Sequence, residues 1–343
     1  MAVHVVRPAQ AVSAHHRPGG GFQNPWGPAS QQSRFSDFLK WALLERPRSR
    51  SRQTPDRATF AAAHRPLAPS FLPREKPEAI AVTWIGHSSF LVQIGGQNLL
   101  LDPVWGERAS PLSWLGPRRW TPPGIPFDAL PPIDGVVLSH DHYDHLDLPT
   151  VRRLVSRYPK AAWRVPMGVA RWLRGKGVTQ VSEHDWWERT QIGSLELTAT
   201  PAQHFSGRRL DNRNRTLWCG WVIRAGDRAV FFAGDTGAHP VFPEIGQRLG
   251  PFDAVLMPIG AYNPEWFMGP VHIGPEQAVA AVQALGGAPA MIGMHWGTFQ
   301  LTDEPMDEPP KRTTAAWIRA GLEPHRLWIP SLGETRRWPL HLH

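Results

Sequence analysis

Residues 140–145, with the sequence HDHYDH, form the densest group of candidate metal ligands in the chain. They follow an apolar run typical of a buried strand, so we expect them on a loop at the end of that strand. His140 and His142 are two residues apart and can direct their imidazoles from one turn to a shared metal ion. Asp144 and His145 can then reach a second ion nearby. Mixed imidazole and carboxylate ligands suit zinc and similar divalent ions.

Three further candidate ligands lie after other strand-like runs. His204 occurs in TATPAQHF, Asp235 in FFAGDTG and His295 in MIGMHWGTF. Each alone could equally be a structural residue with satisfied hydrogen bonds. Their shared position at the C-terminal ends of predicted strands favours convergence on the same site, because such ends often meet at one edge of a sheet.

With these residues, the sequence resembles the metallo-β-lactamase fold superfamily, whose pattern is His-x-His-x-Asp-His followed by a later His, an Asp and a final His. Within it, the sequence is most similar to the N-acyl-phosphatidylethanolamine-hydrolysing phospholipase D family and its bacterial relatives. The similarity runs from about residue 22 to about residue 337. The matching stretches are NPW at 24–26, TWIGHSSF at 83–90, LDPVWGERASP at 101–111, LPPIDGVVLSHDHYDHLD at 130–147, DWWE at 185–188, FFAGDTG at 231–237, GPFDAVLMPIGAYNPEWFM at 250–268 and HWGTF at 295–299.

The resemblance implies a dinuclear centre with two Zn²⁺ ions, and other divalent metals are compatible with the same donors. The implied ligands are His140, His142 and His204 for one ion, Asp144, His145 and His295 for the other, and Asp235 as the bridge between them.

Further roles are carried over from the resemblance to residues around this centre. Asp102 matches an aspartate that orients the metal-binding loop without binding the metal, and it could equally cap the loop before a proline. His272 matches a histidine near the substrate phosphate, with a catalytic and substrate-binding role, and Tyr143 matches a tyrosine that contacts substrate. The match is incomplete at Ser113 and Val271, where the mammalian member of the family has glutamines, so recognition of the lipid head group is expected to differ.

The expected activity is that of a phosphodiesterase of phospholipase D type acting on N-acyl phosphatidylethanolamine-like lipids. The alternative on the same fold is a metal-dependent lactonase or small-molecule phosphodiesterase. A nuclease is less expected because no added nucleic-acid domain interrupts the sequence, and a di-iron oxidoreductase commonly has Glu in place of His142. From a different class, a catalytically silent membrane- or nucleic-acid-binding module would have no need of all seven ligands. We expect a phospholipid or other phosphodiester as partner and no nucleic acid; a homodimer is left open.

The hydrophobic pattern predicts an α/β fold of two packed mixed β-sheets flanked by helices, the αββα sandwich. A Pro-rich loop over 102–134 interrupts the first group of strands. Strands are predicted at 79–84, 89–94, 98–101, 136–138, 194–200, 217–224, 228–233, 254–259 and 290–294, and helices at 148–158, 275–285 and 312–320.

Charge and composition divide the 343 residues into an arm and a body. Residues 1–76 contain 12 Lys and Arg against 4 Asp and Glu, whereas the rest of the chain is electrically balanced. We expect a disordered arm over 1–32, an amphipathic helix and a Pro/Arg-rich linker over 33–78, and the hydrolase domain over 79–343. The single cysteine excludes an internal disulfide, and no apolar run reaches the roughly 18 residues of a membrane span. These features favour a cytoplasmic protein, with peripheral contact to the inner face of the membrane as an open alternative.

Overall fold

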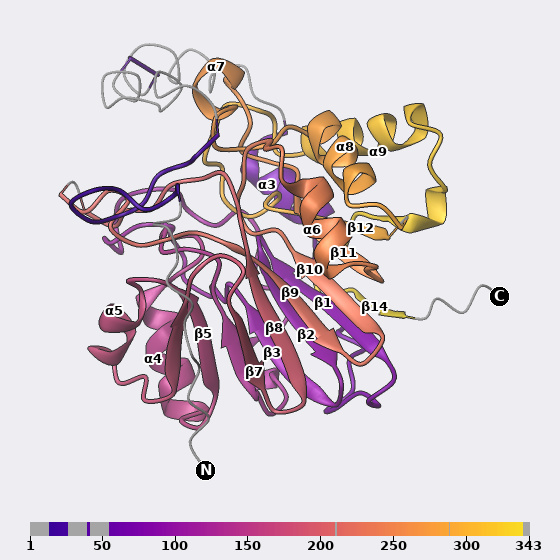
Figure 1. The fold of residues 1–343 in the computed structure, drawn as a ribbon. Helices are drawn as coiled ribbons and strands as arrows, with labels where there is room; N and C mark the ends of the chain where they lie inside the picture. The colour runs from indigo at the N-terminus through magenta and orange to yellow at the C-terminus, as the bar shows by residue number, and fades with distance from the viewer. Residues whose placement is uncertain (1–13, 27–39, 42–54, 210, 288, 339–343) are drawn as a thin grey trace.

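The computed structural model describes residues 14–26, 40–41, 55–209, 211–287 and 289–338. Two seven-stranded sheets face each other, and helices cover their outer faces (Figure 1). The αββα sandwich predicted from the sequence is therefore confirmed.

The first sheet combines an antiparallel and a parallel half. Its order is β14-β1-β2-β3-β4-β5-β6; β14, β1, β2 and β3 pair antiparallel, and β3 to β6 pair parallel. Gly95 and Gly96, with φ of 58° and 72°, form the tight turn between β2 and β3, where a two-residue hairpin needs left-handed backbone. The strands are β1 (Ile80–Gly86), β2 (Ser89–Ile94), β3 (Gln97–Leu101), β4 (Gly135–Val137), β5 (Ala162–Pro166), β6 (Val181–His184) and β14 (Thr335–Trp338).

The second sheet follows the same plan. Its order is β13-β12-β11-β10-β9-β8-β7, with antiparallel pairs from β7 to β10 and parallel pairs from β10 to β13. The strands are β7 (Arg189–Ile192), β8 (Leu195–Thr200), β9 (Gly220–Ala225), β10 (Arg228–Phe232), β11 (Ala254–Pro258), β12 (Ala290–Met294) and β13 (Leu327–Trp328).

Helices cover both sheets on their outer faces (Figure 1). Helices α4 and α5 pack on the first sheet, and α6, α8 and α9 on the second. Helix α4 begins after Asp147, whose side chain accepts a hydrogen bond from the Thr150 backbone N–H and so caps the first turn. The helices are α3 (Arg57–Ala63), α4 (Leu148–Arg157), α5 (Ala170–Arg174), α6 (Phe242–Leu249), α7 (Glu265–Met268), α8 (Pro275–Ala284) and α9 (Glu308–Arg319).

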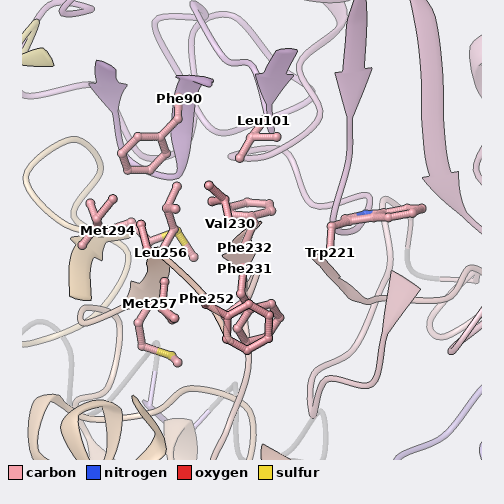
Figure 2. Packing of buried hydrophobic residues seen from close by; sticks show 14 of the residues in the cluster. Phe90, Leu101, Trp221, Val230, Phe231, Phe232, Phe252, Leu256, Met257 and Met294 are labelled. Atoms are coloured by element: carbon pink, nitrogen blue, oxygen red, sulfur yellow. The ribbon is translucent and has the colours of Figure 1, made fainter. Parts of the chain in front are cut away.

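The main hydrophobic core lies between the two sheets. Phe90 from the first sheet meets Val230, Phe232 and Leu256 from the second (Figure 2). The next residue, Leu91, belongs instead to the cluster beneath α4 and α5, because successive side chains of a strand point to opposite faces. Both faces of the central strands are thus buried, which explains their continuous apolar sequences.

The N-terminal region differs from the prediction. Residues 14–26, expected in a disordered arm over 1–32, fold back on themselves through the bridge between His16 and Phe22 and pack against the body. Helix α3 lies in the predicted linker, and its Phe60 side chain is fully buried. A segment rich in Pro, Gly and Arg can therefore be ordered when a few aromatic side chains anchor it. The predicted helix within 33–78 lies largely outside the described residues.

Two further expectations concern Cys219 and membrane spans. Cys219 is buried, as its apolar neighbours in the sequence indicate. It is the single cysteine of the chain and is a free thiol. Among the described residues, no helix combines the length and the apolar character needed to cross a membrane.

Candidate metal centre

The topology brings the predicted ligands to one edge of the sandwich. β1, β3 and β4 run in the same direction in the first sheet, and β8, β10 and β12 run in one direction in the second. The loops that follow these strands therefore meet at the same edge, which explains why residues as far apart in sequence as His87 and His295 converge. The residues that follow them are His87, Asp102, His140 with its neighbours, His204, Asp235 and His295.

Three imidazoles form the first group of donor atoms. His140 Nε2 lies 2.9 Å from His142 Nδ1, and His204 Nε2 lies 3.2 Å from the same His142 atom. Ligand nitrogens about 2.05 Å from a tetrahedral zinc ion are roughly 3.3 Å from each other. The three nitrogens are therefore spaced as ligands of one metal ion would be.

Hydrogen bonds on the far side of two rings indicate where their lone pairs point. His204 Nδ1 lies 2.9 Å from the Val271 carbonyl and must donate to it, which leaves the Nε2 lone pair directed at His142. His140 Nδ1 lies 2.8 Å from Ser139 Oγ, whose own hydroxyl is donated to a buried carboxylate, so His140 also presents an Nε2 lone pair. His142 Nδ1 carries at most one proton and cannot satisfy both. A cation among the three nitrogens fits this arrangement.

The second group combines imidazoles with carboxylates. Asp144 Oδ2 lies 3.3 Å from His145 Nε2 and 3.4 Å from His295 Nε2, and Asp235 Oδ2 lies 3.1 Å and 2.9 Å from the same two nitrogens. Although the oxygens are close, neither nitrogen makes a hydrogen bond of acceptable geometry within the described structure. Buried donor atoms that surround a common point without pairing are expected of ligands for a second cation.

Asp235 lies between the two groups. Its Oδ2 atom is also 3.9 Å from both His140 Nε2 and His204 Nε2, and its Oδ1 atom makes no hydrogen bond in the described structure. Burial raises the pKa of this carboxyl, but attraction to His145 and His295 outweighs burial and holds the pKa well below its usual range. An ionised carboxylate at this point can contact cations in both groups.

The two groups differ in electrostatic character. Burial, with repulsion from neighbouring imidazoles, lowers the pKa of His204 to about 3. Burial also lowers the pKa of His142 to about 4. The imidazoles of the first group are therefore neutral. Burial also lowers the pKa of His295, but the Asp235 carboxylate overrides it and raises the pKa to about 9. The second group thus favours positive charge, and the first provides the neutral imidazoles that bind metals.

Asp102 stabilises the metal-binding loop through contacts with Ser139 and His145. It directly follows β3 and is fully buried; its Oδ1 accepts from the Ser139 backbone N–H at 2.7 Å, and its Oδ2 lies 2.7 Å from His145 Nδ1. The second contact fixes the His145 proton on Nδ1 and leaves Nε2 free for a metal. This position agrees with the orienting role that the resemblance implies.

Two residues of the centre were not assigned a role from sequence. His87, directly after β1, places Nε2 2.9 Å from Asp144 Oδ2, and its backbone N–H donates to Thr298 Oγ1. Asp141 accepts hydrogen bonds from the Gly207 backbone N–H and from Thr216 Oγ1, both at 2.9 Å, and so links two loops that carry candidate ligands. The position of His87 after a strand was the signal available for it.

The N-terminal segment also reaches the centre. Asn24 donates from Nδ2 to the His204 carbonyl at 2.8 Å and accepts through Oδ1 from the His204 backbone N–H at 3.2 Å. Earlier in the same segment, His15 Nε2 and His16 Nε2 lie 2.6 Å and 2.7 Å from the carboxylate oxygens of Asp185. The Asn24 contacts hold residues 14–26 against the loop that carries His204, and the His15 and His16 contacts hold the same segment against Asp185.

The two residues expected to contact substrate lie in different surroundings. His272 is buried, with its ring 5.0 Å from that of His204 and 5.2 Å from that of His295, and burial holds its pKa well below the ordinary value. Its Nδ1 atom makes no hydrogen bond in the described part of the chain. Tyr143 instead donates its hydroxyl to the Arg208 carbonyl at 2.8 Å. His272 thus adjoins the centre, whereas the Tyr143 hydroxyl is already engaged.

Comparison with known proteins places this geometry in a family. The model of the β-lactamase superfamily domain matches residues 97–296, which include both groups of donors. The chain belongs to the metallo-β-lactamase superfamily. The predicted resemblance is thereby confirmed, and the His/Asp centre is that of a superfamily of metal-dependent hydrolases.

Individual relatives agree with this assignment. An uncharacterized protein of Mycobacterium tuberculosis is 44% identical over 76% of this chain and 70% of its own length. The N-acyl-phosphatidylethanolamine-hydrolyzing phospholipase D 1 of Caenorhabditis elegans is 42% identical over 64% of each chain. Among solved structures, the metallo hydrolase Igni18 of Ignicoccus hospitalis has a TM-score of 0.57 at 23% identity, covering 76% of this chain and 99% of its own. The structural likeness supports the fold, and the sequence likeness supports the branch.

Proposed function

We propose that the protein is a dinuclear zinc-dependent phosphodiesterase of phospholipase D type that hydrolyses N-acyl phosphatidylethanolamine-like lipids. The observation that carries the proposal is the position of Asp235 Oδ2, within 2.9–3.9 Å of imidazole nitrogens from both donor groups. The lipid substrate is supported by the name and the 42% identity of the nematode relative.

Seven residues would hold the two ions: His140, His142 and His204 the first, Asp144, His145 and His295 the second, and Asp235 both. When bound, such ions make hydroxide available near neutral pH and neutralise charge on phosphate oxygens. Asp102 and His87 keep the rings and carboxylates of this set in place through the hydrogen bonds described above.

His272 is the proposed catalytic residue outside the ligand set. Its imidazole is buried beside the rings of His204 and His295, and its Nδ1 atom has no hydrogen-bond partner among the described residues. Because burial keeps the ring neutral, it can offer an N–H to a phosphate oxygen or to the leaving alkoxide.

Metal analysis tests the centre. The purified protein is expected to contain about two zinc equivalents, and Asp235→Asn is expected to lose metal and activity together, because the amide removes the negative charge shared by both groups. An Asp211→Asn variant, which changes an exposed carboxylate paired with Arg209, serves as the matched control. Full metal occupancy and normal turnover in Asp235→Asn would contradict the bridging role.

A substrate panel tests the reaction. N-acyl phosphatidylethanolamine, a bis-aryl phosphodiester, a lactone and a β-lactam are compared with the same metal-loaded protein. Phosphatidic acid and N-acylethanolamine, identified by mass spectrometry, are the expected products. Diacylglycerol or free fatty acid would show that a different bond is cleaved, and turnover of the lactone or of the aryl diester alone would favour the alternative functions.

A further inference from the structure

A cavity of about 1190 Å³ lies beside the metal-binding loop and is lined by none of the seven candidate ligands. Its walls come from the loop over 105–113, the start of α4, helix α5, and residues 208–209, 211–212 and 215–216. Asp141 and Tyr143 of the metal-binding loop form part of the wall. The cavity and the metal centre therefore share one loop between them.

Four cationic side chains around this cavity have no carboxylate partner. Arg152, Arg171, Lys176 and Arg215 line it, and none of them forms an ion pair within the part of the chain that the structure describes. Unpaired exposed cations are common singly, but four around one concave surface focus a positive potential into it.

The acidic groups of the same cavity are already engaged. Asp141 accepts hydrogen bonds from a neighbouring loop, Asp147 caps α4, and Asp211 pairs with Arg209 at 3.0 Å. Glu107 lies 3.6 Å from Arg118. These carboxylates do not neutralise the four free cations directly.

Aromatic side chains complete the wall. The Arg208 guanidinium lies between the rings of Tyr143 and Trp172, 4.0 Å and 4.7 Å from their centroids, and Lys176 lies 5.7 Å from the Trp172 centroid. Arg208 also donates to the carbonyls of Asp141 and Leu146, at 2.7 and 2.6 Å. This stack makes a rigid surface of mixed apolar and cationic character next to the free cations.

We propose that this cavity binds a phosphate group, carried by an anionic phospholipid head group or by a soluble phosphomonoester. Arginine guanidinium groups match phosphate oxygens bidentately, and lysine adds a point charge. Leu112, which lines the cavity, is 40% exposed, and Trp114, two residues further along the chain, is 70% exposed; both favour a head group at a lipid surface.

The test compares two double variants of the full-length, metal-loaded protein. Arg152→Ala/Arg171→Ala removes two free cations of the cavity. Arg57→Ala/Arg65→Ala removes two exposed arginines from α3 and its surroundings, which do not line it. Binding is measured by calorimetry with glycerol phosphate and by flotation with phosphatidylglycerol vesicles, with phosphatidylcholine vesicles for comparison. Metal content and far-ultraviolet circular dichroism check that both variants fold.

The cavity variant is expected to bind at least about tenfold more weakly than wild type, whereas the α3 variant binds normally. Loss of vesicle flotation identifies a lipid head group as the source, and loss of glycerol phosphate binding alone identifies a soluble phosphomonoester. Phosphate bound at the metal centre is retained by both variants, so it does not mimic the effect. Wild-type binding by the cavity variant in both assays, or equal losses in the two variants, would overturn the proposal.

Discussion

Histidines in this protein take opposite roles because their surroundings differ. His204 donates from Nδ1 to a carbonyl and presents Nε2 to the metal centre. His239 instead lies between aromatic rings, 4.0 Å from that of Phe242 and 5.1 Å from that of Trp26. Burial lowers the pKa of His239 to about 3, so it acts as a neutral aromatic residue.

The burial of His239 predicts a specific acid sensitivity. An unfolded chain protonates histidine near its ordinary pKa of about 6.5, whereas the folded protein keeps His239 neutral down to about pH 3. Between these values the unfolded state binds more protons, so the free energy of unfolding falls as the pH falls, by up to about 1.4 kcal/mol per unit. His239→Phe is expected to flatten this dependence, as measured by urea unfolding from pH 7 to pH 4. Identical slopes in both proteins would show that His239 does not titrate on unfolding.

At the scale of elements, the sequence predicts the strands that precede the candidate ligands, together with β2, β9 and β11, and it misses β5, β6, β7, β13 and β14. β10 and β12 are largely apolar runs followed within three residues by a candidate ligand, Asp235 or His295, so pattern and chemistry agree. β7 and β14, with sequences RTQI and TRRW, are polar strands at the edges of their sheets and lack that pattern. β14 also pairs with β1 across some 250 residues, a contact that local patterns do not encode.

The same limit applies to the site. Ligands could be found because their residue types are those that bind metals, but apart from Asp102 the partners that hold them were found only in the structure. Asn24 and His204 are 180 residues apart, and nothing in NPW indicates which backbone the asparagine contacts. His87 was visible after a predicted strand, yet its contact with Asp144 depends on the packing of two loops.

The contact of Asn24 with the His204 backbone predicts an effect on metal affinity. Asn24→Ala removes both hydrogen bonds and is expected to weaken metal binding about 10- to 100-fold, the range for residues that orient ligands. Competition with a chromophoric chelator measures it. Gln23→Ala is the neighbouring control, since that side chain donates only to the Ala14 carbonyl. Equal metal affinities in wild type and Asn24→Ala would show that Asn24 does not influence metal binding.

At the scale of the whole molecule, segments from both ends of the chain complete the fold around a central sandwich. Near the N-terminus, Phe22 and Phe60 belong to the main core. The segment after α3 is fastened by ion pairs of Arg74 with Asp134 at 2.7 Å and of Glu75 with Arg337 of β14 at 2.8 Å. The basic N-terminal region therefore contains parts of the fold as well as the net charge of the chain.

Deletion of residues 1–76 distinguishes a removable membrane arm from an integral part of the fold. It removes two buried phenylalanines, the Asn24 contacts and both ion pairs, and loss of each buried phenylalanine alone costs about 3–5 kcal/mol. Against a total stability of about 5–15 kcal/mol, the truncated protein is expected to aggregate or to lose its metal. Deletion of residues 1–13 removes none of these contacts and serves as the control. The measurements are thermal unfolding, zinc content and sedimentation with anionic vesicles. A folded, metal-loaded 77–343 fragment that no longer sediments would instead show that residues 1–76 act mainly as a membrane arm.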